Sequence, residues 1–284
     1  MKIWEKAPAK INLTLDVLNK RDDGFHEVEM IMTMIDLVDR ISFEEREDGA
    51  IVVETTSSII PTDERNIIYK AAKLLQDEFA IQKGMHIYLD KKIPIAAGLG
   101  GGSSDAAATL RGLNRLWQLN LSNEQLESYG ARLGSDVPFC VSGKTAVARG
   151  RGELLEQLSP MPAGWILLAK PAVSVSTKVI YNKLDYRSIA QHPETGRMIE
   201  AIAAKDLNAI LSLLYNVLQP LTFSLYPEVE GLANQMRDYG VSNVVMSGSG
   251  PTLYTLSSKE SSLSKIYNAL RGFCGDVYVT RLLR

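Results

Sequence analysis

Residues 94–108 read P-I-A-A-G-L-G-G-G-S-S-D-A-A-A, and four of the five positions from 98 to 102 are glycine. A glycine run of this density costs backbone entropy on folding, so a structural or functional reason is expected for it. Alternating apolar residues at 85–89 predict a strand before the run, and apolar residues at helical spacing over 106–117 predict a helix after it. The local order is therefore strand, glycine loop and helix N-terminus.

The junction between the loop and the helix has the features of an anion site. Ser103 and Ser104 stand where a helix N-cap is expected, and a helix N-terminus offers N–H groups and the positive end of its dipole. Because glycines have no side chains, a phosphate chain can approach their backbone closely. The stretch predicts a phosphate-binding loop; the alternative is a flexible surface loop that happens to precede a helix.

Two common glycine motifs do not fit the loop. A Walker A loop ends in Gly-Lys before Ser or Thr, and no lysine follows these glycines. The dinucleotide fingerprint G-x-G-x-x-G also fails, because Gly98 and Gly100 lead to Ser103, and Gly100 and Gly102 lead to Asp105. A different class of nucleotide-binding protein is therefore indicated.

The form P-x-x-x-G-L-G-G-G-S-S-D-A-A resembles the phosphate loop of the GHMP kinases. The extra glycines and Asp105 are most similar to the 4-diphosphocytidyl-2-C-methyl-D-erythritol kinase branch. The resemblance implies an α+β fold with a ribosomal-protein-S5-like α/β domain at 1–160 and a ferredoxin-like domain at 161–284. It also implies that ATP is bound by Pro94, Ile95, Ala96, Ala97, Gly98, Leu99, Gly100, Gly101, Gly102, Ser103 and Ser104.

Composition is that of an ordinary globular protein, with 45% hydrophobic and 23% charged residues among 284. The net charge of -2 argues against nucleic acid as the main partner. No secretory signal or bilayer-length apolar run is evident, so a cytoplasmic protein without a membrane partner is expected. Cys140 and Cys274 are expected to be buried free thiols. Oligomeric state is left open.

The segment A-P-A-K-I-N-L-T-L at 7–15 predicts an edge strand broken at Pro8, with the odd-numbered positions after Lys10 buried. Lys10 taken alone would be a solvated lysine at the edge of a strand. The string, however, resembles the opening of the same kinases, and the resemblance implies that Lys10 is catalytic. It further implies that Asn12 binds the erythritol chain of the substrate.

A turn signal follows at 21–27, R-D-D-G-F-H-E, in which Asp23-Gly24 favours a hairpin. One interpretation is a hairpin with an incidental aromatic residue. The other is that Phe25 stacks on a base while the ring nitrogens of His26 meet the edge of that base. The string resembles the cytosine-binding corner of the same kinase family, which favours the second interpretation.

Asp136 lies in L-G-S-D-V-P-F at 133–139, after a glycine that ends a predicted helix. By itself it would be the N-cap of a short following turn. The segment resembles the part of the family that carries the catalytic aspartate, so Asp136 is expected to take the proton of the attacking hydroxyl, or only to orient it. Lys10 would keep Asp136 ionised and offset charge on the transferred group.

Further similar segments imply the remaining substrate contacts. Lys144 and Thr177 are expected near the cytidine, and Tyr181 is expected on the face of the cytosine opposite Phe25. A second glycine-rich segment, V-V-M-S-G-S-G-P-T at 244–252, resembles a loop that backs the active site in this superfamily.

Periodicity and capping signals predict the remaining elements. Asp63 is expected to cap a helix, and Ser122 with Gln125 forms a capping box for another that closes at Gly134. The other predicted elements are strands at 28–35, 40–45, 50–55, 165–169 and 276–283 and helices at 195–203, 206–218 and 227–238.

The resemblance implies ATP-dependent phosphorylation of the 2-hydroxyl of 4-diphosphocytidyl-2-C-methyl-D-erythritol in the non-mevalonate isoprenoid pathway. Mg²⁺ is expected to accompany ATP, with a contact from Ser104 or Asp105; a helix-dipole role for Asp105 is the alternative. One rival is a GHMP kinase for a small alcohol such as homoserine or mevalonate, which would not need Phe25 and His26. A catalytically silent nucleotide sensor of the same fold is disfavoured by the presence of both Lys10 and Asp136.

Overall fold

A computed structural model describes residues 2–283 of the chain. They form two compact units that are interleaved along the sequence. Among the described residues, unit 1 comprises 2–9, Leu37–Ile95 and Gly100–Gly143, and unit 2 comprises Lys10–Asp36, Ala96–Leu99 and 144–283. The expected domain division after residue 160 stays a prediction. No helix within 2–283 is long and apolar enough to cross a membrane.

Two long strands, β1 (Lys2–Lys20) and β2 (His26–Arg46), contribute to both units. The predicted break at Pro8 is wrong. Proline has no backbone N–H to donate to a neighbouring strand. Strand β8 pairs with β1 at Thr14 and Leu15, so the pairing of β8 with β1 loses no hydrogen bond at Pro8. The predicted strands at 28–35 and 40–45 are one strand, which runs through Asp39; this residue is fully buried and accepts from the backbone N–H groups of Lys92 and Ile93.

The strand order in the larger sheet is β3-β4-β2-β1-β8, with β5 beside β2 and β6 beside β5. The pairs β3–β4 and β1–β8 are parallel, whereas β2–β4, β2–β5 and β5–β6 are antiparallel. The shorter strands are β3 (Ile51–Thr55), β4 (Gly84–Asp90), β5 (Ala146–Arg149), β6 (Leu154–Gln157) and β8 (Tyr215–Asn216).

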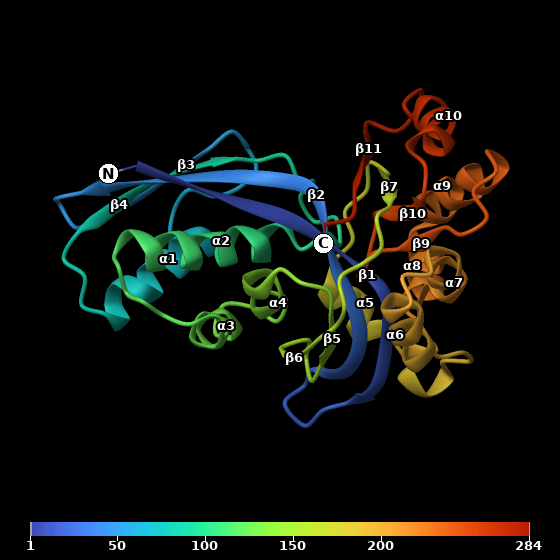
Figure 1. Cartoon of the computed structure of the whole chain (residues 1–284), viewed down its shortest axis with the longest axis horizontal. Helices are drawn as coiled ribbons and strands as arrows, with labels where there is room; N and C mark the ends of the chain where they lie inside the picture. Colours follow the sequence, from blue (N-terminus) through green and yellow to red (C-terminus); the bar gives the residue numbers. More distant parts are fainter. Residues whose placement is uncertain (1, 284) are drawn as a thin grey trace. The chain divides into compact units, whose positions relative to one another are not determined.

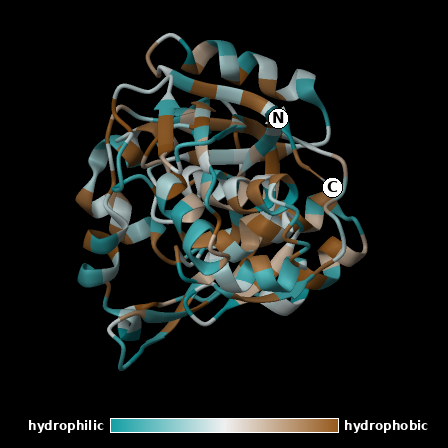
Figure 2. Cartoon of the chain, turned by 90° about the vertical axis from the view of Figure 1, so that its left-hand side faces the viewer, coloured by the Kyte–Doolittle hydropathy of each residue, from teal (hydrophilic) through white to brown (hydrophobic). Residues whose placement is uncertain are grey.

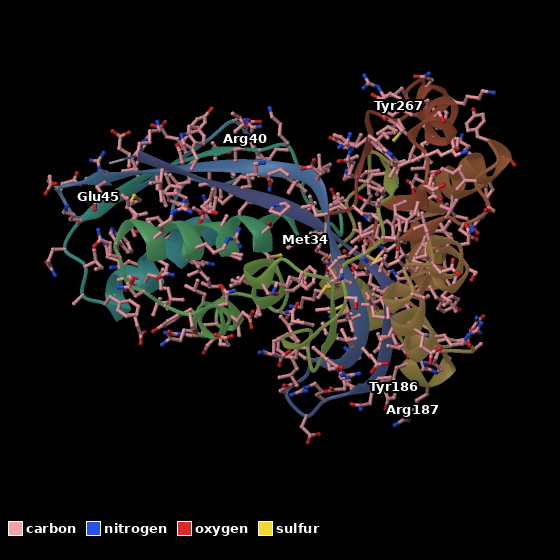
Figure 3. The ribbon with its side chains drawn as sticks, in the orientation of Figure 1. Met34, Arg40, Glu45, Tyr186, Arg187 and Tyr267 are labelled. Carbon is pink, nitrogen blue, oxygen red and sulfur yellow. The ribbon has the colours of Figure 1, made fainter. Side chains whose placement is uncertain are left out.

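Four helices belong to unit 1: α1 (Ile67–Glu78), α2 (Gly101–Leu116), α3 (Asn123–Ala131) and α4 (Val137–Ser142). Figure 1 shows them on one side of the strands of this unit. A Cβ on Gly112 of α2 would lie 2.6 Å from the ring of Phe43 on β2. The helix therefore packs closely on the strand because residue 112 has no side chain. Arg40 lies on the outer side of β2 (Figure 3).

Helix caps in unit 1 follow the sequence in one case and depart from it in another. The capping box of Ser122 and Gln125 is present at α3, as predicted, although the helix ends at Ala131, before Gly134. The cap of α1 is Asn66, whose side chain accepts from Ile68 N at 2.8 Å. Asp63 was predicted for that role, but its carboxylate is used by Arg65 in the preceding turn.

Unit 2 contains a four-stranded antiparallel sheet in the order β11-β7-β10-β9. Its central strand β7 is buried along 166–169, as expected for a strand covered on both faces. Figure 1 shows α10 beside this sheet, where it contacts β7, β10 and β11. The strands are β7 (Trp165–Lys170), β9 (Val245–Met246), β10 (Leu253–Ser257) and β11 (Asp276–Arg281).

The helices of unit 2 are α5 (Thr177–Lys183), α6 (Thr195–Ala203), α7 (Leu207–Leu213), α8 (Gln219–Leu225), α9 (Pro227–Asp238) and α10 (Glu260–Leu270), with a 3₁₀ turn, η1, at Tyr186–Ser188. The predicted helices at 195–203 and 227–238 are confirmed. The one predicted at 206–218 stops at Leu213 and is followed by β8. Helices α8 and α10 and the short strands β5, β6 and β8 were not predicted.

Figure 2 shows hydrophobic and hydrophilic residues alternating along the helices and strands, as expected for elements with one buried face. The mixture of sheets and packed helices confirms the α+β class. Cys140 and Cys274 are both buried, and neither forms a disulfide within residues 2–283, as the sequence predicted.

Candidate active site

The base of the glycine loop lies in unit 1, where helix α2 begins. Gly100 is its N-cap, in a left-handed conformation with φ 64° and ψ 20°. The prediction that Ser103 or Ser104 caps the helix is wrong, because the glycine lets the chain turn into the helix three residues earlier. The amides of Gly101, Gly102 and Ser103 are the first of α2, and such amides have no acceptor within their own helix.

The tip of the loop, Ala96–Leu99, lies in unit 2. Leu99 O accepts from Lys10 N at 2.9 Å, and Gly98 O accepts from Ser247 Oγ at 2.8 Å. Gly98 has φ +72°, and a Cβ there would overlap Ser247 O, so only glycine fits this position. The second glycine-rich segment therefore holds the loop tip, and its expected place behind the active site stays a prediction.

Gly102 differs from Gly98 and Gly101 because a side chain there would meet only an ordinary van der Waals contact. A Cβ there would meet nothing closer than Ile67 Cγ2 at 3.9 Å, whereas a Cβ on Gly101 would lie 3.0 Å from Lys91 Nζ. Neither packing nor a positive φ requires glycine at 102. The remaining physical reason is the approach of a ligand to the first turn of α2.

Replacing Gly102 by valine is therefore expected to raise KM for ATP about tenfold or more, as lost phosphate hydrogen bonds would. Folding should be spared, because valine costs less than glycine inside a helix. Steady-state kinetics at varied ATP and urea unfolding measure the two effects. Gly100→Val is the contrasting variant, since its left-handed φ would strain the fold by about 1–3 kcal/mol. Normal ATP affinity in Gly102→Val would exclude this turn as the phosphate site.

A buried charge cluster in unit 1 joins the end of β4 to α2. Lys91 Nζ donates to Asp105 Oδ2 at 2.7 Å and to Asp39 Oδ2 at 2.5 Å. Asp39 Oδ1 also accepts from the backbone N–H groups of Lys92 and Ile93. Sequence analysis missed Lys91 and Asp39, which no motif marks and which meet Asp105 only through the fold.

Asp105 is the fifth residue of α2 and its side chain points into this cluster. Its Oδ1 has no hydrogen-bond partner among the described residues. Burial raises the pKa of Asp105 well above its usual range, although the nearby Lys91 ammonium opposes the shift. The contact with Lys91 is thus the main interaction of Asp105, rather than one with the helix dipole.

Asp105→Asn is expected to change how stability depends on pH. Because the folded-state pKa of Asp105 is raised, the folded protein binds this proton more tightly than the unfolded chain, whose pKa is about 3.9. The carboxyl therefore contributes stability at low pH that is lost as pH rises above about 4. Urea unfolding at a series of pH values measures this effect. Between pH 4.5 and 8 the free energy of unfolding should fall less in Asp105→Asn than in the wild type. Equal losses in both proteins would contradict the expectation.

Lys10 and Asn12 lie two residues apart on β1 in unit 2, and the structure brings their side chains together. Lys10 is 4% exposed and its Nζ donates to Asn12 Oδ1 at 2.7 Å. Asn12 Nδ2 donates to Met30 Sδ at 3.1 Å, and Tyr254 Oη donates to Asn12 O at 2.7 Å. The amide of Asn12 therefore orients the ammonium of Lys10, a role that the sequence did not indicate.

Asp136, in unit 1, is the residue from which α4 starts. It has helical φ and ψ of −85° and −9°, and its side chain makes no capping hydrogen bond. Asp136 is therefore the N-cap residue of α4 by position, as the alternative interpretation had it, but its carboxylate does not cap the helix. The other end of α4 is held by Arg111, whose Nη1 donates to Cys140 O at 2.7 Å. Like Lys91 and Asp39, Arg111 fixes a local structure and lies in no motif that the sequence analysis recognised.

The predicted base-binding corner lies in unit 2, at the hairpin between β1 and β2. The turn is closed by Arg21 N, which donates to Phe25 O at 2.8 Å. His26 is buried, and its ring centroid lies 5.2 Å from that of Tyr181 at an interplanar angle of 40°. Burial, with a smaller effect of Lys20, lowers the pKa of His26, which favours the neutral imidazole near pH 7.

The remaining predicted substrate residues occupy different settings within unit 2. Thr177 is the first residue of α5, and its hydroxyl lies 2.8 Å from that of Ser249 in the second glycine-rich segment. Ser249 O in turn accepts from Thr222 Oγ1 at 3.3 Å. Lys144 is exposed directly after Gly143, which ends α4.

Comparisons with known proteins bear on the family and the fold of the chain. Residues 66–144 match the family model of the GHMP kinases N terminal domain, and residues 198–276 match that of the GHMP kinases C terminal. A protein of Shouchella clausii called 4-diphosphocytidyl-2-C-methyl-D-erythritol kinase is 53% identical over 284 residues, covering 100% of this chain and 95% of that relative. The protein of the same name from Bacillus subtilis is 53% identical over 283 residues, covering 100% and 98%.

Solved structures give the same result. A crystal structure of 4-(cytidine 5'-diphospho)-2C-methyl-D-erythritol kinase matches with a TM-score of 0.83 and 31% identity over 99% of both chains. A homoserine kinase from Cytophaga hutchinsonii shares the fold, with a TM-score of 0.77 at 22% identity over 99% of this chain and 95% of the other.

The fold and both domain matches are those of the GHMP kinases, a class of small-molecule kinases. Identity of about half over the full chain narrows the class. The chain belongs to the 4-diphosphocytidyl-2-C-methyl-D-erythritol kinase family.

Proposed function

We propose that this protein transfers the γ-phosphate of ATP to the tertiary 2-hydroxyl of 4-diphosphocytidyl-2-C-methyl-D-erythritol, giving the 2-phosphate and ADP in the non-mevalonate route to isoprenoids. One observation carries the proposal. A chain that is 53% identical to a kinase of that name over 284 residues also has the phosphate, catalytic and base-binding motifs that this reaction needs.

Phosphoryl transfer depends on positioning and charge neutralisation more than on covalent help. The amides at the start of α2 and the loop at 94–104 are proposed to hold the ATP phosphates. Asp136 accepts the proton of the 2-hydroxyl, or orients it, as the new oxygen–phosphorus bond forms and the bond to the ADP oxygen breaks. Lys10, oriented by Asn12 at 2.7 Å, offsets the charge that grows on the transferred group.

Mg²⁺ is proposed to accompany ATP and to neutralise phosphate charge. Within residues 2–283 no cluster of three or more His, Cys, Asp or Glu could hold a metal ion. This suits Mg²⁺, which usually keeps several waters and binds substrate phosphates with few protein ligands. Ser104 is the proposed protein contact; its buried hydroxyl donates to Pro8 O at 2.7 Å and keeps its lone pairs for a second partner.

The cytosine ring is proposed to stack on Phe25 and Tyr181, with His26 at its edge and with Lys144 and Thr177 near the cytidine. A neutral imidazole supplies one donor and one acceptor, and burial favours that form at His26.

The division into domains after residue 160, the cytoplasmic location and the lack of a nucleic-acid partner stay predictions.

The proposal is tested by measuring ADP release with the purified protein and three alcohols: 4-diphosphocytidyl-2-C-methyl-D-erythritol, homoserine and mevalonate. Turnover is expected with the cytidine diphosphate alcohol alone, with phosphorus NMR showing a new phosphate monoester on its erythritol carbon 2. Turnover with homoserine or mevalonate instead would favour a small-alcohol kinase. ATP binding without transfer to any of the three would favour a nucleotide sensor.

A further inference from the structure

The guanidinium of Arg151 lies over the ring of Phe25 in unit 2. Its Cζ is 5.1 Å from the ring centroid, within the range of a cation–π contact. The two residues are far apart in sequence, and Arg151 lies in the turn between β5 and β6. The turn at 150–153 therefore supplies a cation to the aromatic residue of the β1–β2 hairpin.

Arg151 is held in this position by its own turn. Its backbone N–H donates to Glu153 Oε2 at 2.6 Å, and its Nε lies 3.4 Å from Glu153 Oε1. Gly150 has φ +72°, and a Cβ there would lie 3.1 Å from Glu153 Oε2. The left-handed glycine thus lets the carboxylate of Glu153 fold back over the turn and hold Arg151.

The same turn is tied to the hairpin that carries Phe25. Val28 N donates to Gly150 O at 2.8 Å, and Gly150 N donates to Glu27 Oε1 at 3.1 Å. The other oxygen of Glu27 accepts from Arg21 Nη1 at 2.6 Å. Hydrogen bonds therefore connect the turn at 150–153 to both sides of the hairpin and fix the height of Arg151 above the ring.

Phe25 is nevertheless 52% exposed, so the guanidinium leaves much of the ring open. An exposed aromatic side chain loses rotamer freedom when a ligand stacks on it, and holding it in advance reduces that cost. A guanidinium is suited to this task because it is planar and stacks on aromatic faces.

We propose that Arg151 is a positioning residue for Phe25: it covers one face of the ring and presents the other face to the pyrimidine of the substrate. This inference rests on the proposed function, since it takes Phe25 as the residue on which the base stacks. Arg151 acts through Phe25 and has no direct contact with the phosphates.

The test compares binding of cytidine, which is uncharged, with binding of cytidine 5'-diphosphate, by NMR titration and calorimetry. Arg151→Ala is expected to weaken both ligands by the same factor, about two- to fivefold, the size of an exposed cation–π contact. Arg151→Lys should recover part of the loss, because an ammonium also lies favourably over a ring. KM for the cytidine substrate should rise by a similar factor, while kcat and KM for ATP stay unchanged.

A double-mutant cycle identifies the route of the effect. Phe25→Ala alone is expected to weaken cytidine about tenfold or more, as loss of base stacking does. In that background Arg151→Ala should have no further effect, because its partner is gone. An Arg151→Ala effect that persists without Phe25, or that appears with the diphosphate and not with cytidine, would overturn the inference in favour of direct phosphate binding.

Arg271→Ala is the matched control. Its guanidinium lies 5.7 Å from the ring centroid of Tyr267 on α10, and Tyr267 lies away from the hairpin (Figure 3). The variant removes the same charge and the same kind of contact, so cytidine binding should be unchanged. If the wild type binds neither ligand, the proposed function fails; if it binds both and Arg151→Ala binds them equally well, only the positioning role of Arg151 fails.

Discussion

Replacing Asp136 by asparagine is expected to lower kcat by about a hundredfold or more, the usual size of a lost general base. KM for ATP should stay nearly unchanged, since the ATP phosphates are proposed to bind the glycine loop. Single-turnover kinetics with saturating ATP separate the chemical step from binding.

The Asp136→Asn substitution is expected to change activity without changing stability. Asparagine has nearly the size and shape of aspartate and is as good an N-cap, so it can take the position from which α4 starts. The free energy of unfolding should therefore change little, which urea titration checks. A loss of activity would then report on chemistry rather than on the helix.

The matched control is Asp206→Asn. Asp206 also begins a helix, α7, but its carboxylate does cap it, accepting from Asn208 N and Ala209 N at 3.0 and 3.1 Å. Asparagine can replace that cap, so both stability and kcat should be retained. Near-normal turnover in a folded Asp136→Asn protein would remove Asp136 from the mechanism.

Substrate specificity should show the second large effect: the cytidine substrate is expected to be preferred over its uridine analogue by about a hundredfold or more in kcat/KM. Cytosine offers an amine donor at position 4 and an acceptor at N3, whereas uracil offers a carbonyl and an N–H. A buried partner that fits one pattern is left unpaired by the other, at about 1–3 kcal/mol for each mismatched group.

His26 is the side chain proposed to make this distinction. It is buried, its lowered pKa favours the neutral ring, and Tyr181 packs at 5.2 Å from it, so it presents a fixed donor and acceptor. His26→Ala should narrow the gap between the two substrates. Phe25→Ala should weaken both alike, because stacking is tolerant of the base.

Competition between the two substrates in one reaction measures the preference directly. Equal rates for cytidine and uridine substrates in the unmutated enzyme would contradict the cytosine corner. If the preference for the cytidine substrate in kcat/KM is unchanged in His26→Ala, backbone groups and not His26 distinguish the two bases.

Sequence patterns correctly predicted structural features that depend on residues close together in the chain. Helix periodicity placed α6 at 195–203 and α9 at 227–238, and the Ser122–Gln125 capping box is present. The sequence predicted the wrong N-cap where two possible capping residues lie within a few positions of each other. Asn66 caps α1 although Asp63 precedes it, and Gly100 begins α2 although Ser103 and Ser104 follow.

By itself the sequence determined the class of this protein. The glycine run of 98–102 and the segments of 21–27 and 133–139, proposed to bind the base and to catalyse the transfer, each lie within one short stretch, so they can be recognised without a fold. Their order along the chain was enough to indicate the kinase family that the comparisons then showed.

Only the tertiary structure decided how these residues are held. Lys91 meets Asp39 and Asp105 across 52 and 14 residues of chain, and Arg151 reaches Phe25 from the turn after β5. Such pairs leave no local pattern, because a buried charge or an exposed ring needs a partner nearby in space and not in sequence. Which partner arrives is settled by strand pairing and helix packing, and these bring distant segments together.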